Sequence, residues 1–142
     1  MKPLSLSTLL IAVTSFTANA SSNYGIAAKN NQDPIFIEKC DVYQQAQKEG
    51  DLETLKSFVD KVWFEGDKAK RAEQALLKKA ARFEQRVSKA GNYIVKEKRL
   101  SDKTQDNFAE VLINWTNGDK FSSNDGCVFE KIKDSDLWRI HL

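Results

Sequence analysis

The chain has 142 residues, of which 22 are basic and 20 acidic, so its formal net charge at neutral pH is +2. This length allows one domain, and 41% hydrophobic residues with only two prolines exclude a disordered or collagen-like chain. The near-neutral balance speaks against a dedicated nucleic-acid-binding protein, which usually carries a strong basic excess on one face.

Residues 1–20 have the pattern of an export signal. Lys2 supplies the positive charge, an apolar stretch runs from Leu4 to Phe16, and residues 18–20 form the Ala-Asn-Ala pattern that signal peptidases cleave. The apolar stretch is shorter than the roughly 18–20 residues of a membrane-spanning helix. We therefore expect cleavage before Ser21 instead of a membrane anchor, and a mature protein that is periplasmic or secreted, with no membrane span.

The chain contains two cysteines, Cys40 and Cys127. In an oxidising compartment, an even pair most simply forms a disulfide. Two separately buried thiols or a redox pair are the alternatives, although the sequence has no Cys-x-x-Cys spacing.

The mature chain is predicted to begin with a flexible leader over residues 21–33, which are small and polar without any period. A single domain is expected over residues 34–142. Its first helix starts at Asp33-Pro34, a capping residue before a proline in the first turn, and ends at Gly50. One face of this helix carries Phe36, Cys40, Tyr43 and Gln47.

Two further helices follow. Asp51 caps the second, whose predicted apolar stripe consists of Leu52, Leu55, Phe58, Val59, Val62 and Trp63. The third runs between Gly66 and Gly91, with apolar residues every three or four positions and charged residues between them.

After Gly91 the hydrophobic period changes from helical to two, which predicts strands. Their expected ranges are Asn92–Leu100, Phe108–Thr116, a strand from Lys120 to Lys133 interrupted at Asn124–Gly126, and Leu137–Leu142. Asn117-Gly118 is a strong hairpin dipeptide. The predicted fold class is α+β, with three N-terminal helices packed on a curved antiparallel sheet of four to five strands.

Three segments carry a family resemblance: Gly50–Glu53 between the first two helices, the alternating residues 109–113, and the closing residues 136–140. They resemble the nuclear transport factor 2-like superfamily, in particular its small exported bacterial, lumazine-binding-like members of unknown function. The resemblance covers Pro34 to Leu142 and implies a cone, cystatin-like in outline, whose interior holds a small molecule, is solid core, or leaves the outer face of the sheet for protein contacts. The long, charged third helix departs from many members and favours a shallow or filled cavity.

The superfamily includes a ketosteroid isomerase-like branch, which uses an acidic general base and a tyrosine or protonated acid in an apolar pocket. Tyr43 and Tyr93 are the candidate phenols. The predicted inward strand positions carry no carboxylate: Val111, Ile113, Trp115, Trp138 and Ile140. We therefore assign no catalytic residue and no cofactor. His141 is opposite in phase to its buried neighbours and is expected to face solvent, without partners for a metal.

Two surface features bear on binding. A basic run follows the third helix: Lys68, Lys70, Arg71, Lys78, Lys79, Arg82, Arg86 and Lys89. Because acidic residues are interspersed, a solvated amphipathic face is favoured over a site for anionic lipid, cell-wall polymer or an acidic partner. The candidate ligand or partner contacts are aromatic: Tyr43, Trp63, Tyr93, Trp115 and Trp138. Tryptophans are most simply core, but any left exposed is expected to anchor a protein partner.

The favoured function is an exported, non-enzymatic binding or protein-interaction domain, with an immunity-type inhibitor of a periplasm-acting toxin as one form. Its expected partner is a toxin or an envelope protein, and a homodimer through the sheet is a further expectation. The alternative is a small apolar-ligand carrier or an isomerase-like enzyme that uses the family cavity.

Overall fold

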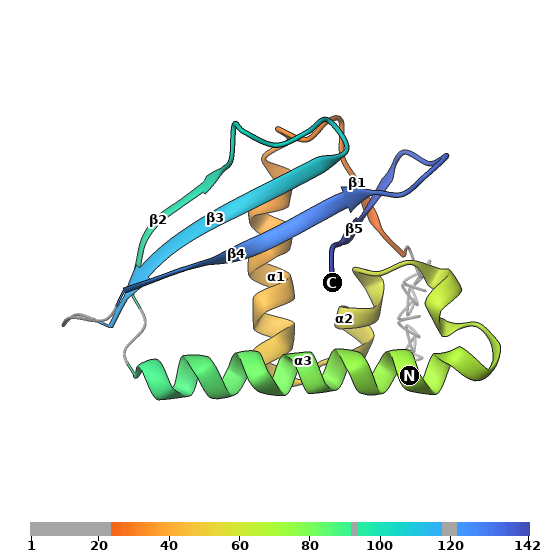
Figure 1. Cartoon of the computed structure of the whole chain (residues 1–142), viewed down its shortest axis with the longest axis horizontal. Coiled ribbons are helices and arrows are strands. Elements are labelled where there is room, and N and C mark those ends of the chain that lie inside the picture. The colour runs from red at the N-terminus through yellow and green to blue at the C-terminus, as the bar shows by residue number, and fades with distance from the viewer. Residues whose placement is uncertain (1–23, 92–93, 118–121) are drawn as a thin grey trace, which may run out of the picture.

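The computed structural model describes residues 24–91, 94–117 and 122–142. Its helices lie on one side of a curved, five-stranded antiparallel sheet with strand order β1-β5-β4-β3-β2 (Figure 1). The helical elements are α1 (Ile35–Glu49), α2 (Leu52–Ser57), the 3-10 turns η1 (Lys61–Phe64) and η2 (Gly66–Lys68), and α3 (Ala69–Ala90). The strands are β1 (Ile26–Ala27), β2 (Ile94–Leu100), β3 (Phe108–Thr116), β4 (Ser122–Lys131) and β5 (Leu137–Ile140). The predicted α+β class is confirmed.

The boundary between α1 and α2 has the local chemistry that the sequence predicts. Gly50 ends α1 in the left-handed region at φ 66°, a conformation that glycine adopts at little cost, and its N–H donates to the Ala46 carbonyl. The next residue, Asp51, caps α2 by accepting a hydrogen bond from the Thr54 N–H at 3.1 Å. Together they turn the chain sharply between two helices.

The second helix is much shorter than the predicted stripe, so the prediction of one helix through Trp63 is wrong. It ends at Ser57 because backbone carbonyls at this point accept hydrogen bonds from other segments of the chain. Gly25 N–H donates to the Ser57 carbonyl at 2.8 Å, and Ile140 N–H donates to the Phe58 carbonyl at 2.7 Å. These tertiary bonds replace the helical bonds that those carbonyls would otherwise accept.

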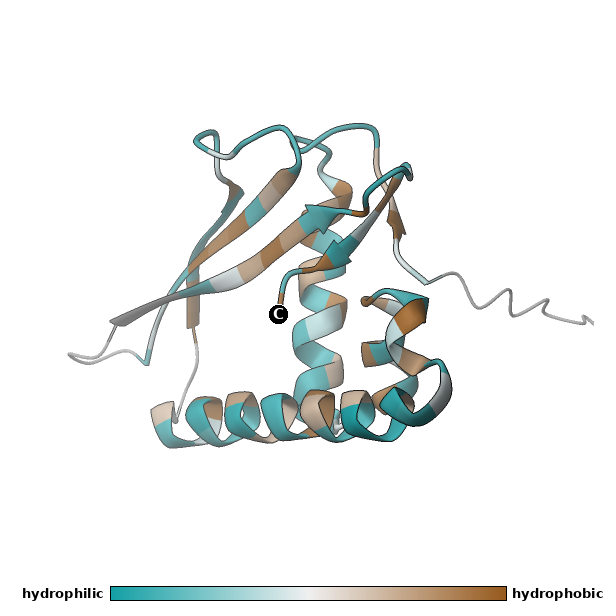
Figure 2. Ribbon diagram, turned by 45° about the vertical axis from the view of Figure 1, so that its right-hand side comes forward, coloured by the Kyte–Doolittle hydropathy of each residue, from teal (hydrophilic) through white to brown (hydrophobic). Residues whose placement is uncertain are grey.

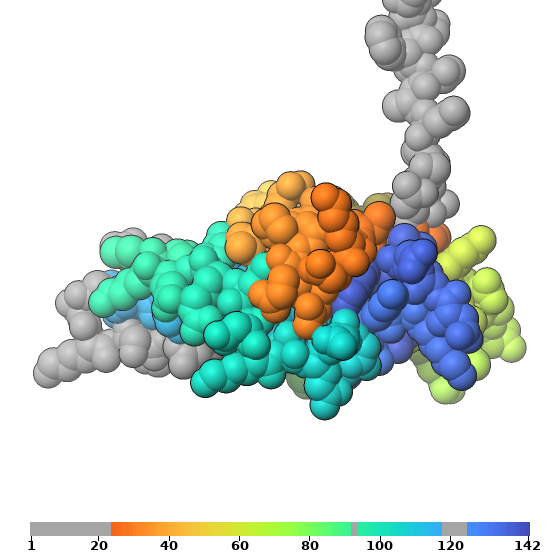
Figure 3. All heavy atoms as spheres, turned by 90° about the horizontal axis from the view of Figure 1, so that it is seen from above, coloured from red at the N-terminus to blue at the C-terminus, as the bar shows by residue number. Residues whose placement is uncertain are grey.

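The predicted flexible leader contains ordered structure in its described part. Ile26 and Ala27 form β1, which pairs with Trp138 and Leu137 of β5, and Ile26 is buried. Gln32 Nε2 donates to the Ser101 carbonyl at 2.9 Å, so the segment before α1 also contacts the β2–β3 connection. Figure 3, seen from above, shows this orange segment beside the teal connection. A two-residue edge strand is too short to produce a hydrophobic period, which is why the sequence did not predict it.

The sheet departs from the predictions at two points. First, β4 continues through residues 124–126, where an interruption was expected. Gly126 fits there because a Cβ at this position would lie 1.8 Å from the Val111 carbonyl oxygen. Second, β5 ends at Ile140, two residues before the predicted end. The β2 range agrees with the prediction from Ile94 onward; Asn92 and Tyr93 lie outside the described residues.

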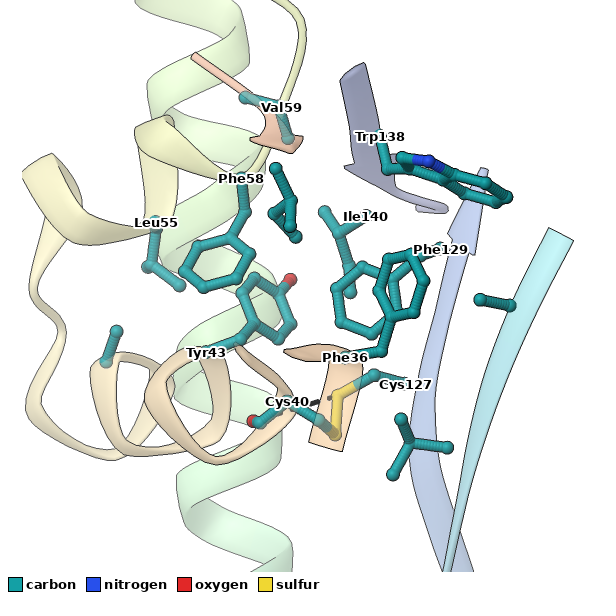
Figure 4. Close-up of a cluster of buried hydrophobic side chains, with 14 of the residues drawn as sticks. Phe36, Cys40, Tyr43, Leu55, Phe58, Val59, Cys127, Phe129, Trp138 and Ile140 are labelled. Carbon is teal, nitrogen blue, oxygen red and sulfur yellow. Dashed lines mark hydrogen bonds between the residues drawn. A yellow bond between two sulfur atoms is a disulfide. The ribbon is translucent and has the colours of Figure 1, made fainter. Parts of the chain in front are cut away.

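The space between α1 and the sheet is filled by aromatic side chains (Figure 4). Phe36 of α1 is fully buried, with its ring centroid 5.0 Å from that of Phe129 and 5.1 Å from that of Trp138. The predicted inward positions Val111, Ile113 and Trp115 are each 1% exposed, which confirms the alternation along β3.

The disulfide that the sequence favours is present and ties α1 to β4. Cys40 and Cys127 are joined by an S–S bond, with their Cα atoms 5.7 Å apart. Both residues are buried next to the aromatic cluster, so the cross-link holds the helix against the sheet at the centre of the core.

Candidate functional site

Three of the aromatic candidates for ligand or partner contact lie in the core. Trp115 and Trp138 are each 1% exposed, and Tyr43 is buried with its ring centroid 5.2 Å from that of Phe58. Burial raises the pKa of Tyr43 to about 12, so its phenol stays protonated at neutral pH. Tyr93 lies outside the described residues. Tyr43, Trp115 and Trp138 therefore belong to the buried core.

Trp63 differs from the other candidates because it lies on the surface. It is 37% exposed, and its neighbour Val62 is 54% exposed. Both belong to η1, which packs on α3. The adjacent Phe64 is held inward, with the Lys56 ammonium 5.1 Å from its ring centroid and the Tyr24 ring 6.1 Å away. The turn thus exposes Trp63 and Val62 to solvent, while Phe64 and the contact with α3 hold it in place.

His141 is exposed, as predicted, and lies beside Glu130 and Arg139. Its Nδ1 lies 3.3 Å from Glu130 Oε2, and the same oxygen accepts a hydrogen bond from Arg139 Nη2 at 3.3 Å. Arg139 also lies 3.7 Å from the Asp60 carboxylate, which links β5 to the segment before η1. Desolvation raises the pKa of Glu130, but His141 and Arg139 together lower it below its usual value. Within the described residues, no group of three or more potential ligands could hold a metal.

The charge of the protein is concentrated in α3. Its 22 residues include seven basic and two acidic side chains, a net +5, whereas the whole chain carries only +2. Figure 2 shows hydrophilic residues recurring along this helix, while its apolar face is formed by Leu76, Ala80 and Phe83. The helix packs on α1, α2 and η1.

Four of these basic residues line two adjoining clefts beside α3. Lys79, Arg82, Arg86 and Lys89 follow each other at steps of three and four residues, which places them along one side of a helix. A cleft of about 370 Å³ is lined by Gln47, Lys79, Arg82, Phe83, Arg86, Asp125 and Gly126. It shares Arg82 and Arg86 with a cleft of about 520 Å³, which is lined as well by Gln85, Lys89, Ala90 and Asn117. We refer to the two together as the α3 cleft.

The cations of the α3 cleft are unevenly neutralised. Arg86 Nη2 lies 2.6 Å from Asp125 Oδ2, and its guanidinium carbon is 5.4 Å from the Phe83 ring centroid. In the part of the chain that the structure describes, Lys79, Arg82 and Lys89 form no ion pair. Desolvation lowers the pKa of Lys79, although the side chain as a whole remains exposed. The cleft is therefore electropositive on its α3 side.

The sequence contains the basic residues of this cleft, but their spacing alone does not show that they form one. The spacing of the four residues is visible, yet the same spacing is typical of an ordinary solvated helix face. What makes them a site is the position of Asp125 and Gly126, some 40 residues further along the chain. That proximity depends on the β4 register, which a single helix pattern cannot predict.

Comparison with known proteins yields a weak structural likeness. No family model matches the sequence, and no curated protein matches it. Among solved structures, the chain is similar to a Campylobacter jejuni protein with the provisional name NTF2-like transpeptidase, at a TM-score of 0.48 and 16% sequence identity. The match covers 70% of this chain and 91% of that one. A likeness this weak indicates no activity for the present chain.

None of the helices in the described residues has both the length and the apolar character that a membrane crossing requires.

Proposed function

We propose that this chain is an exported protein-interaction domain that meets its partner through the surface of η1. The observation that carries the proposal is the exposure of Trp63 beside Val62, while Trp115 and Trp138 are buried. Tryptophan is enriched among the residues that dominate interface affinity, because it buries a large apolar area with few rotatable bonds. An exposed tryptophan on a packed turn is costly to leave in water, and contact with a partner would remove that cost.

The filled interior weighs against the alternative of an apolar-ligand carrier or isomerase-like enzyme. Such a function needs a cavity behind the sheet. Here Phe36, Phe129 and Trp138 occupy the space between α1 and the strands, and the Phe36 ring centroid lies 5.0 Å from that of Phe129 and 5.1 Å from that of Trp138. Ligand binding in this region would require their displacement from a close-packed core.

The proposal also includes the export of the chain and the identity of its partner. A buried disulfide between Cys40 and Cys127 fits an oxidising compartment, which supports a periplasmic or secreted location after removal of residues 1–20. Within that setting, a toxin or an envelope protein is the proposed partner, and an immunity-type inhibitor is the proposed form. Pairing of two copies through β2, whose Ile94 and Val95 are exposed at the sheet edge, stays a prediction.

Site-specific photo-crosslinking in producing cells tests the contact. A photoreactive amino acid at Val62 should give one adduct of defined mass, and Trp63→Ala should remove it. The same amino acid at Lys103, exposed in the β2–β3 connection, serves as the matched control and should give none. Equal adducts at both positions, or none at Val62, would contradict the proposal. An adduct of twice the chain mass would assign this surface to a second copy instead.

A further inference from the structure

Among the described residues, three of the four cations that line the α3 cleft have no carboxylate partner. Lys79, Arg82 and Lys89 form no ion pair within the described residues, although they line the same cleft as Arg86. Like charges on one side of a helix repel each other, so such an arrangement costs free energy in the absence of an anion. A ligand with negative charges would remove that cost.

Arg86 shows which kind of anion suits this surface. Its guanidinium binds the Asp125 carboxylate at 2.6 Å, and the Asp125 side chain is 17% exposed. A charge-assisted bond between arginine and carboxylate thus already exists inside the cleft. The Asp125 charge also disfavours a second anion directly over Arg86, which leaves Lys79, Arg82 and Lys89 as the points for ligand contact.

The spacing of these points requires an extended ligand. At about 1.5 Å rise per residue, Lys79 and Lys89 lie about 15 Å apart along the helix axis. A single phosphate or carboxylate cannot contact both ends. An extended peptide places side chains of the same face about 6.6 Å apart, so three alternate acidic residues span nearly this distance.

Two other polyanions fit the cleft less well. Single-stranded nucleic acid is usually held by exposed aromatic rings on which bases stack. The aromatic residue of this cleft, Phe83, is 7% exposed and has the Arg86 guanidinium beside its ring. An anionic membrane surface is flat on this scale, whereas Lys79 and Arg82 lie in a recess whose opposite wall includes Asp125 and Gly126.

We propose that the α3 cleft binds an extended acidic peptide segment of a partner protein, whose carboxylates pair with Lys79, Arg82 and Lys89. Gln85, which is exposed and lines the same cleft, is placed to contact the peptide backbone. This goes beyond the proposed function, because the residues lie toward the other end of α3 from η1. The peptide-binding proposal and the proposed function can fail separately, because the test below uses synthetic peptides and no variant of Val62 or Trp63.

Fluorescence anisotropy of labelled hexaglutamate with the full, disulfide-bonded protein tests the proposal. Hexaglutamate should bind at low ionic strength and hexaglutamine should not, and the affinity should fall as salt rises. Replacing Lys79, Arg82 and Lys89 by Gln should weaken binding about tenfold or more. The matched control replaces Lys68, Lys70 and Arg71 by Gln, which removes the same charges near the other end of the helix. This control variant should change the affinity for hexaglutamate less than about threefold.

Several outcomes would overturn the proposal. They are no binding of hexaglutamate, equal losses in the two triple variants, or tighter binding of inorganic phosphate, a short single-stranded oligonucleotide or phosphatidylglycerol vesicles. Circular dichroism establishes that each variant is folded before its affinity is compared.

The Asp125→Asn variant adds a test in the opposite direction. Removing this carboxylate frees Arg86 for the ligand and should tighten hexaglutamate binding about two- to fivefold. An unchanged or weaker affinity would contradict the placement of the peptide beside Arg86.

Discussion

The two spaces between helices and sheet differ in what occupies them. Between α1 and the strands, Phe36, Phe129 and Trp138 pack around the disulfide and leave no access to solvent. Between α3 and β4, basic side chains line an open cleft. The difference follows from how each helix is held: α1 packs directly on β3 and β4, whereas α3 packs mainly on other helices and is joined to β4 by the Arg86–Asp125 ion pair. Stability is therefore concentrated in the first space, and binding chemistry in the second.

The largest effect on the free energy of unfolding is expected from removing a large side chain from the core. Trp138→Ala should lower the free energy of unfolding by about 3–5 kcal/mol, because it leaves a cavity against Phe36. Trp63→Ala is the matched control, since it removes the same side chain from an exposed turn and should cost less than about 1 kcal/mol. Guanidinium unfolding measures both. Similar losses in the two variants would contradict the assignment of one tryptophan to the core and the other to the surface.

A smaller loss is expected from opening the disulfide. Cys40→Ser should lower the free energy of unfolding by about 2–4 kcal/mol, because the bridge closes a long loop in the unfolded chain. Reduction of the wild-type protein should reproduce most of this effect. Thiol titration of the denatured, unreduced protein is the independent check, and it should detect no free thiol. Two free thiols would refute the bridge.

The predictable parts of this fold are those that local patterns specify. The periods of α1, α3 and β3 place Phe36, Leu76 and Trp115 on buried faces, and the structure confirms each. The end of α2 was not predictable, because it depends on donors from Gly25 and Ile140, which lie far away in sequence. Tertiary hydrogen bonds of this kind leave no periodic signal in the segment they terminate.

The same difference between local patterns and tertiary contacts explains why the sequence did not identify the candidate sites. Aromatic residue type suits both a core and a binding surface, so Trp63 and Trp138 look alike in the sequence and differ only in the fold. Likewise, the basic residues of α3 have the spacing of a solvated face, and the cleft exists only because Asp125 and Gly126 lie opposite them. Sequence patterns therefore located the residues of interest but not the surfaces they form.

The smallest stability effect is expected in the α3 cleft. Replacing Lys79, Arg82 and Lys89 by Gln should leave the free energy of unfolding within about 0.5 kcal/mol of wild type at neutral pH, or raise it slightly. Desolvation lowers the pKa of Lys79, so the folded protein holds that proton less tightly than the unfolded chain does. The charged lysine therefore opposes folding at neutral pH, and wild-type stability gains from its deprotonation as the pH rises through the lowered pKa.

Urea unfolding of the wild type and of Lys79→Gln across alkaline pH separates this contribution. The difference in stability between them should favour the variant at neutral pH and shrink as the pH rises through the lowered pKa. A large loss of stability in Lys79→Gln would mean that the lysine supports the fold. Unchanged stability combined with lost hexaglutamate binding would instead mark the α3 cleft as a surface kept for a ligand, because its charges then contribute to binding without contributing to folding.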